Sequence, residues 1–381
     1  RREKRWSGVS KQGKEKKKVD SNRKLLSLNL TDKLSGPISS VVAILTGLLI
    51  GLVILLIANP SNALSGFSWI LTGALSSPQD MGNIFYYATP IILTGLSVAF
   101  AFKTSLFNIG ASGQFILGAY GAVLVGVKLT SLGSVHWIAA LIVSALFGAI
   151  WALIPGLLKA YRNVNEVISS IMFNYIGMYL VNYLVRETVY HQLTNRSLPV
   201  AQTANLPTLG LDRLFPGSKI SAGILIAFAV GVLLYIVLNK TVFGYELKAC
   251  GYNRHASRYA GINEKKCIVL SMVIAGALAG LGGGLLYLAG TGKYIYVQDV
   301  LAPEGFAGIS VALLGMSHPI GVLFAGLFIG YITVGGSYMQ LSGFKPEIID
   351  IITAAIIYFA AFSLLFRSML ERLRFKKEAE H

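Results

Sequence analysis

The sequence predicts an all-α protein that crosses a membrane about ten times, with both termini in the cytoplasm. Hydrophobic residues make up 54% of the 381 positions and charged residues only 13%, against about 25% charged in a typical soluble domain. The apolar residues form runs of about 20, the length of a bilayer-spanning helix, whereas outer-membrane barrels alternate over about ten residues. Helices are required, because in lipid every backbone polar group has to be satisfied within the protein.

Nine apolar runs are long enough to cross the bilayer, and a shorter tenth run lies at 303–315. The nine runs lie near 38–58, 82–102, 106–127, 136–158, 166–186, 220–238, 267–289, 318–336 and 348–366. The tenth run is predicted to cross as well, since a segment that only dipped in and out would place the basic residues of 367–377 outside. Pro303 suits the first position of a helix, so this helix is predicted to start near the outer boundary.

Basic residues are predicted to mark the cytoplasmic side. Residues 1–37 contain twelve Lys/Arg and four Asp/Glu, and with ten spans 26 of the 33 Lys/Arg fall inside. We therefore interpret 1–37 as a poorly ordered cytoplasmic tail that sets the topology and contacts membrane lipid, not as a nucleic-acid-binding arm. The transmembrane domain then covers 38–367, and a second cytoplasmic tail covers 368–381.

Two long connections lie between the spans. The segment 187–218 contains three prolines and is predicted to be extracellular, either as a solvated loop or as a docking surface for an external partner. The segment 239–266 is predicted to be cytoplasmic. Within it Asn253 suits an N-cap and Gly261 a C-cap, which predicts about two turns of helix at 254–260 outside the membrane. So short a helix needs a packing partner, in its own bundle or in another protein.

Small residues recur every four positions in two spans, which predicts close helix packing. One stripe runs through 110–126, with Gln114 as its one polar member, and the other consists of glycines within 276–284. Such stripes let helix backbones approach each other in lipid, where no hydrophobic effect drives association. Packing alone says nothing about a substrate.

Two interrupted segments are predicted to line a solute pathway. SLFNIGASG at 105–113 and APEGFAGISVALLG at 302–315 each start irregularly, carry a polar residue and a Phe, and then enter a glycine-containing helix. They run in opposite directions, as an inverted repeat of a transporter would, although their similarity is weak. The polar side chains suit a polar, uncharged solute; the alternative is interhelical hydrogen bonding, worth about 0.6 kcal/mol on average. The candidate pathway residues are Phe107, Asn108, Gln114, Asn174, Glu304 and Phe306.

No motif indicates an enzyme. AGTGKY at 289–294 fails as a nucleotide-binding loop, because Tyr287 and Tyr294 stand where Gly and Ser/Thr are required. The five histidines are scattered, and Cys250 and Cys267 lack the spacing of a zinc site. We therefore expect no catalytic residue, no metal and no disulfide, and interpret the chain as a transport pathway without its own motor.

Four segments carry a resemblance to a known family: FNIGASGQFILGAYGAV, NEVISSIMFNYIG, TVFGYELKACGYNRHASRYAGI and GFAGISVALLGMSHPIG. They resemble the permease subunits of bacterial ABC importers in the branched-chain amino acid/ribose group, in particular the subgroup that serves nucleosides, over roughly 40–366. The resemblance implies a multi-pass plasma-membrane protein that imports nucleosides by alternating access. A sugar such as ribose or galactose is the alternative cargo, and an ATP-independent channel or secondary carrier is the alternative class.

The resemblance also implies partners and a coupling site. The partners are a homologous second permease, a cytoplasmic ABC ATPase that binds ATP and Mg, and an extracellular substrate-binding lipoprotein, so no cofactor is expected in this chain. The segment 187–218 is implied as one surface for the lipoprotein, and 253–261 as the helix received by the ATPase. The implied coupling residues are Gly244, Asn253, Arg254, His255, Ala256, Arg258, Tyr259 and Gly261.

Overall fold

The computed structural model describes residues 38–360 together with residues 362, 365 and 368. The predicted tail at 1–37 and almost all of the tail at 368–381 lie outside the described residues. Within the described part helices dominate, and the only sheet pairs the short strands β1 (Tyr190–His191) and β2 (Arg196–Ser197). The predicted fold class, an all-α polytopic membrane protein, is confirmed.

Eight helices of the described residues are long and apolar enough to cross a membrane. They are the helix Ile38–Ala58, α3 (Pro78–Phe102), α4 (Ala111–Lys128), α5 (His136–Arg162), α6 (Glu166–Thr188), α8 (Gly223–Lys240), α11 (Glu264–Tyr287) and α13 (Pro319–Ser337). The other predicted spans correspond to two shorter helices, α12 (Pro303–Leu314) and α14 (Pro346–Ala360).

Several short elements join the long helices. They are α2 (Ala63–Thr72), α7 (Leu211–Leu214), α9 (Val242–Tyr252), α10 (Arg254–Tyr259) and the 3₁₀ turns η1 (Gly73–Leu75), η2 (Thr130–Val135), η3 (Gln202–Ala204) and η4 (Tyr338–Ser342). The predicted extracellular loop 187–218 therefore contains the β-hairpin, η3 and α7, and the predicted coupling loop 239–266 contains two helices instead of one.

α12 is too short to cross a bilayer by itself. Its 12 residues rise about 18 Å, against a hydrocarbon core about 30 Å thick. The chain before it, 288–302, is irregular and buries Ile295 and Val297, and its Tyr296 forms a bridge to Arg196 of the hairpin. The predicted tenth crossing is thus a half-length helix preceded by irregular chain that the protein partly covers.

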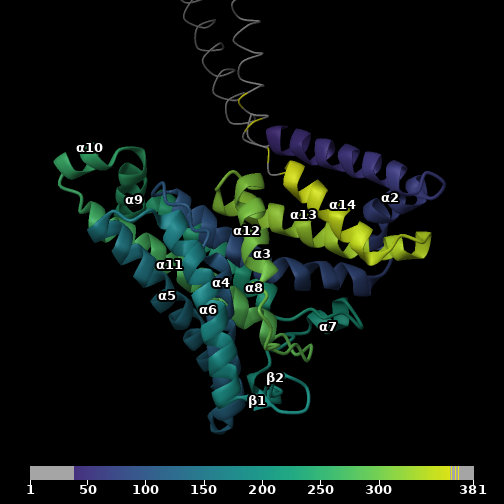
Figure 1. The fold of residues 1–381 in the computed structure, drawn as a ribbon, viewed down its shortest axis with the longest axis horizontal. Helices are drawn as coiled ribbons and strands as arrows, with labels where there is room; N and C mark the ends of the chain where they lie inside the picture. Colours follow the sequence, from purple (N-terminus) through teal and green to yellow (C-terminus); the bar gives the residue numbers. More distant parts are fainter. Residues whose placement is uncertain (1–37, 361, 363–364, 366–367, 369–381) are drawn as a thin grey trace, which may run out of the picture.

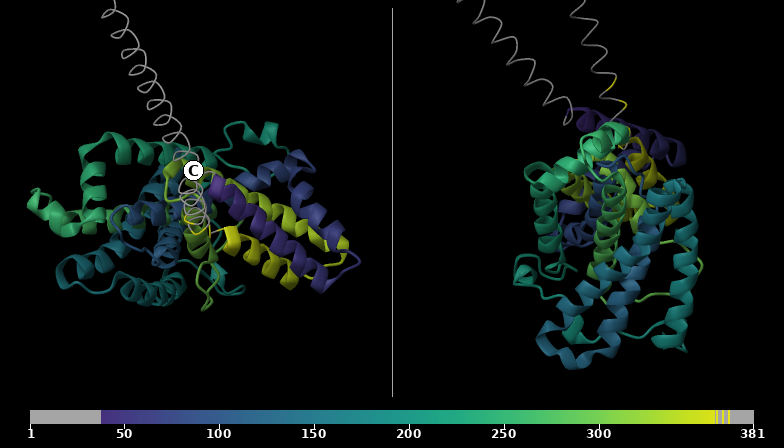
Figure 2. Two further views of the ribbon diagram at one scale, coloured as in Figure 1. Left: turned by 90° about the horizontal axis from the view of Figure 1, so that it is seen from above. Right: turned by 90° about the vertical axis from the view of Figure 1, so that its left-hand side faces the viewer.

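The helices form two groups joined by α3 (Figure 1). α4, α5, α6 and α11 pack together in one group, while α13, α14 and the helix Ile38–Ala58 form the group at the right of Figure 1. α3 packs on α11, on α12 and on α13. The start of the first described helix lies beside the end of α14 (Figure 2), where Gly47 faces Ile356. The described chain therefore enters and leaves the bundle on one side, as an even number of crossings requires.

The glycine stripes bring α4, α5 and α11 into backbone contact. A Cβ placed on Gly118 would lie 2.3 Å from the Cα of Gly280, and one on Gly148 would lie 2.2 Å from the carbonyl oxygen of Gly276. Real Cβ atoms do not approach backbone so closely, so only glycine fits at these crossings. The predicted packing role of the two stripes is confirmed.

Candidate functional site

The predicted pathway residues Asn108 and Gln114 bind each other at the start of α4. After α3 the chain turns at Ser105, which has a positive φ of 53°, and runs back into the bundle. The Asn108 Nδ2 donates to the Gln114 Oε1 at 2.8 Å, and the Gln114 Nε2 donates to the Asn108 Oδ1 at 3.0 Å. The Asn108 Nδ2 also donates to the Ser97 hydroxyl at 3.2 Å. The buried amides satisfy each other and are covered in this conformation.

Asn174 of α6 holds the first turn of α4. Its Oδ1 accepts a hydrogen bond from the Gly113 N–H at 2.8 Å, and its Nδ2 donates to the Ile109 carbonyl at 3.0 Å. Gly110, the N-cap of α4, has no side chain that could cap this helix. Asn174 of α6 therefore supplies the hydrogen-bond acceptor for the Gly113 N–H group, which would otherwise be unpaired. The structure thus gathers the three predicted amides around one helix N-terminus; their contact with a solute stays a prediction.

The N-termini of α4 and α12 meet against the middle of α3. The Ser112 hydroxyl donates to the Ala302 carbonyl at 2.9 Å, and a Cβ placed on Gly305 would lie 2.4 Å from the Cα of Ser112. The Thr94 hydroxyl of α3 donates to the Glu304 carbonyl at 2.8 Å. The two segments singled out in the sequence are therefore in contact. Paired ends of interrupted helices are typical of the solute sites of transporters.

An ion pair borders a cavity beside the α12 N-terminus. The cavity, of about 220 Å³, is lined by α4, α6 and residues of 287–304. The Lys293 Nζ lies 3.2 Å from the Glu304 Oε1 and 5.7 Å from the centre of the Tyr287 ring. Glu304 is thus paired with a cation, which the sequence did not reveal because Lys293 belongs to the irregular segment 288–302.

The two predicted aromatic pathway residues lie in different surroundings. Phe107 stacks on Phe102, with ring centres 5.2 Å apart and planes at 15°, so one face of its ring is occupied. Phe306 is 38% exposed on α12. Stacking of either ring on a solute stays a prediction.

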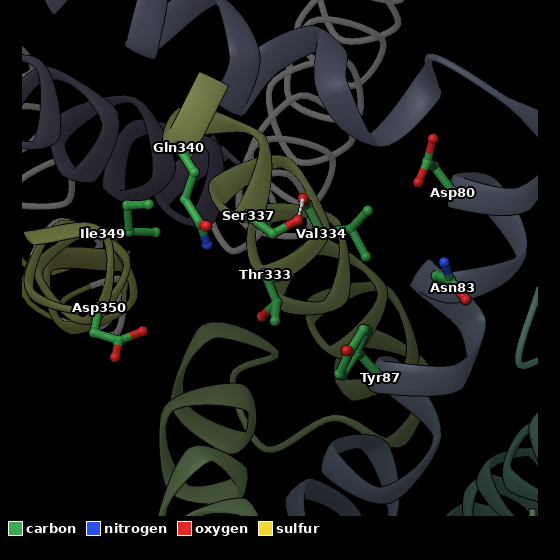
Figure 3. Close-up of a pocket in the computed structure, with 9 residues that line it drawn as sticks. All are labelled: Asp80, Asn83, Tyr87, Thr333, Val334, Ser337, Gln340, Ile349 and Asp350. Carbon is green, nitrogen blue, oxygen red and sulfur yellow. Dashed lines mark hydrogen bonds between the residues drawn. The ribbon is translucent and has the colours of Figure 1, made fainter. Parts of the chain in front are cut away.

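A second, more polar pocket lies at the other end of α3 (Figure 3). It has a volume of about 300 Å³ and is formed by the first turns of α3, the last turns of α13, η4 and the start of α14. Seven of its nine lining residues are polar: Asp80, Asn83, Tyr87, Thr333, Ser337, Gln340 and Asp350. Sequence reasoning missed this pocket, because Asp80 and Gln340 lie outside the predicted spans and their helices meet only in the fold.

The short helix predicted at 254–260 is present as α10 (Arg254–Tyr259), and its coupling role stays a prediction. The Asn253 side chain accepts a hydrogen bond from the Ala256 N–H at 3.0 Å, and Gly261 follows the helix with a φ of +82°. Ser257 is the buried residue of this helix, whereas Tyr259 is 95% exposed. The helix projects at the upper left of Figure 1. Its small and aromatic face is therefore not packed on its own bundle.

Two of the implied coupling residues, Asn253 and Ala256, line a groove between α9 and α10. The groove has a volume of about 430 Å³ and includes Ala256 and Ala260 in its lining. His255 and Arg258 are exposed and Arg254 is half-buried. Gly244 lies near the start of α9, where a Cβ would be 2.2 Å from the Val237 carbonyl oxygen, so a larger residue would not fit there. Contact with an ATPase stays a prediction.

Basic groups gather at the same end of the molecule. Gly251 of α9 packs on the Lys103 backbone, at the end of α3. Burial and, secondly, the charge of Lys248 lower the pKa of Lys103. Burial and, secondly, Lys103 lower the pKa of His318, which favours a neutral imidazole at pH 7. Positive charge at this end agrees with the predicted cytoplasmic side.

The chain is similar over almost its full length to several ABC transporter permeases. It is 38% identical to the guanosine ABC transporter permease protein NupP of Bacillus subtilis, over 91% of this chain and 99% of the relative. It is 36% identical to the nucleoside ABC transporter permease protein NupB of Lactococcus lactis, over 92% and 97%. The glucose ABC transporter permease protein TsgB13 of Haloferax volcanii is 33% identical, over 86% and 87%.

A further relative and the family match complete the comparison. Bacillus subtilis has a second guanosine ABC transporter permease protein, NupQ, which is 27% identical over 69% of this chain and 84% of its own length. No solved structure matches the chain. The family described as the branched-chain amino acid transport system / permease component matches residues 81–361. The chain is a multi-pass membrane protein that belongs to this family of permeases.

Proposed function

We propose that this chain is the permease subunit of an ATP-driven importer of nucleosides. The observation that carries the proposal is the similarity to two permeases named for guanosine and nucleoside transport, which extends over more than nine-tenths of this chain. The meeting of two interrupted helices at Ser112 and Gly305 supports a solute pathway through the bundle. The capped and exposed α10 supports coupling to a partner outside the membrane.

The importer contains three further components in this proposal. The presence of a second guanosine permease protein beside NupP in one organism supports a second, homologous permease chain. A cytoplasmic ATPase binds ATP and Mg and receives α10, and an extracellular lipoprotein delivers the nucleoside at the side that carries 187–218. The assembly lies in the bacterial plasma membrane.

In an alternating-access cycle the junction between α4 and α12 has to open and close. With the Asn108–Gln114 pair closed, both amides are used within the protein, so a solute at this depth must displace or separate them. Because each buried amide must find a new partner when the pair opens, the pair favours the closed state until a hydrogen-bonding solute is present. ATP-driven movement of α10 opens and closes this junction in the proposed cycle.

Uptake of labelled guanosine and uridine by cells with and without this chain tests the proposal. We expect uptake to fall to background in the deletion strain and to return with the wild-type chain. Uptake should also be lost when the ATPase is inactivated by substitution of its catalytic residue. Unchanged uptake in either strain overturns the proposal.

The similarity to a glucose permease favours one second candidate, a sugar importer of the same architecture. Competition decides between the two: unlabelled ribose, galactose or glucose in excess leaves nucleoside uptake unchanged in a nucleoside importer. Uptake of labelled sugar that depends on this chain favours the second candidate. Transport by the purified chain in liposomes without an ATPase would place it instead among channels or secondary carriers.

A further inference from the structure

The pocket of Figure 3 is too polar to face the lipid tails. Its walls come from α3, α13, η4 and α14, and seven of its nine lining residues carry a polar or charged side chain. Ionisable residues in membrane proteins face a water-filled cavity or the interior of the bundle, because lipid does not solvate them. The volume of about 300 Å³ reaches the lower end of the range of about 300–1,000 Å³ found for small-molecule sites.

Asp80 is a buried acid with one oxygen left for a ligand. The side chain is only 7% exposed. Its Oδ2 accepts hydrogen bonds from the Ser77 hydroxyl at 2.5 Å and the Tyr338 hydroxyl at 2.6 Å. Within the described residues its Oδ1 makes no hydrogen bond and Asp80 forms no ion pair. The carboxylate is therefore held in position by one oxygen, and Asp80 is one of the residues that line the pocket.

The pocket carries negative charge without a compensating cation. Asp350 is the second acid in the lining, and the lining contains no Lys, Arg or His. Ion pairs in the described part of the chain involve neither acid. A ligand with a phosphate is repelled by two carboxylates, whereas hydroxyl groups are suitable donors to them. The charge therefore selects a neutral or cationic ligand.

The remaining lining groups suit a planar, hydrogen-bonding ring. The Asn83 side chain accepts from the Lys219 N–H at 3.1 Å, which leaves its NH₂ group available. Gln340 brings both a donor and an acceptor, and Tyr87, which is 37% exposed, brings an aromatic ring. Carboxylates, amides and an aromatic ring in one pocket match a molecule that combines hydroxyl groups with a heteroaromatic ring.

We propose that this pocket binds the nucleoside on the outer side of the membrane, with Asp80 and Asp350 accepting hydrogen bonds from the ribose hydroxyls. Tyr87 stacks on the base, and Asn83 and Gln340 bind its edge. The two carboxylates exclude nucleotides. The assignment rests on the proposed function and names its substrate-receiving site.

The position of the pocket fits this role. Asp80 lies in the first turn of α3, and Lys103, beside the cytoplasmic α9, follows the last turn of the same helix. The helix rises about 35 Å between Asp80 and Lys103. The pocket therefore lies on the side opposite α10, where a solute arrives from outside.

Equilibrium binding to the purified full-length chain in lipid nanodiscs, without the lipoprotein, tests the proposal. We expect saturable binding of labelled uridine and guanosine that is displaced by unlabelled nucleosides but not by ribose or uridine monophosphate. Displacement by ribose alone at the same concentration, or equal displacement by the monophosphate, overturns the assignment.

Substitutions in the pocket give the sharper result. Asp350→Asn affects an exposed residue, so the fold is retained, and removing the charged acceptor should weaken uridine binding about tenfold. Asp80→Asn should act in the same direction, and Tyr87→Ala more strongly than Tyr87→Phe. The double variant Asp80→Asn/Asp350→Asn should lose most of the discrimination against uridine monophosphate.

Glu347→Gln is the matched control, because Glu347 is an exposed acid of the same helix outside the lining. It should bind uridine as the wild type does. Uptake by cells separates the two proposals. Absence of uptake with the wild-type chain overturns the proposed function. Normal uptake by the wild type, together with unchanged uridine affinity in the Asp350 and Tyr87 variants, overturns only the assignment of this pocket.

Discussion

Asn108 and Gln114 hydrogen-bond each other in both directions, at 2.8 and 3.0 Å, across the point where the irregular chain enters α4. Six residues separate them in sequence, yet both are at most 1% exposed. The same two amides therefore stabilise the fold and are predicted to line the solute pathway.

Replacing both members of this pair should cost less than the sum of the two single replacements. Asn108→Leu or Gln114→Leu leaves one buried amide without its partner, at a cost of about 1–3 kcal/mol each. The double variant should be destabilised by less than the sum, since neither amide then remains unpaired. Thermal unfolding of the purified chain in detergent measures this, with the exposed Asn239→Leu as the control. Additive effects would contradict the pair.

Transport by the Gln114→Leu variant separates the pathway role from packing. If Gln114 contacts the solute, uptake should fall more than the amount of protein in the membrane. Uptake and abundance that fall in parallel would leave only the packing role. Both quantities can be measured in the same cells by labelled nucleoside and by immunoblot.

The crossing of α5 and α11 should tolerate no methyl group. A Cβ on Gly280 would lie 2.5 Å from the Ser144 carbonyl oxygen and 2.9 Å from the Gly148 Cα. Gly280→Ala should therefore force the helices apart and destabilise the fold by about 1–3 kcal/mol. Gly223→Ala is the matched control, because its Cβ would meet only side-chain atoms at 3.3 Å or more. Equal thermal stability of the two variants would contradict the close crossing.

Local sequence signals predicted the helices and their caps. Pro303 begins α12, and Asn253 and Gly261 flank α10, because capping depends on residues within one turn. The sequence did not reveal the contacts between segments. Lys293 meets Glu304 because the irregular chain 288–302 passes beside the hairpin before α12 begins. Contacts of this kind leave no periodic pattern in the sequence from which they could be predicted.

The same distinction explains the pocket of Figure 3. Asp80 reads as part of a loop before the apolar run at 82–102, although Ser77 caps a helix that includes it. Its partner Tyr338 is 258 residues away, and Asp350 lies on a third helix. Three helix ends form the pocket, and helix ends are the parts of a membrane span that hydropathy locates least well.

The ion pair between Lys293 and Glu304 should matter for transport because it holds segment 288–302 against the start of α12. Lys293→Glu or Glu304→Lys places two like charges near 3 Å apart and should push segment 288–302 away from the start of α12. The exchange of both charges should restore part of the uptake that each single variant loses. Uptake by the three variants at equal membrane abundance measures this. A double variant no better than the singles would show that the pair is not a contact required for transport.

Substitutions at α10 should separate ATP hydrolysis from transport while the chain remains inserted. Arg258→Glu reverses an exposed charge on this helix, which weakens its contact with a protein surface that receives a basic helix. Gly261→Pro is incompatible with the φ of +82° at that position, because proline fixes φ near −65°. Both variants should lose the stimulation of the ATPase by substrate, measured as phosphate release by the reconstituted importer. Arg213→Glu on the exposed α7 is the control for charge reversal, and it should keep the stimulation. Full stimulation in both α10 variants would remove the coupling role from this helix.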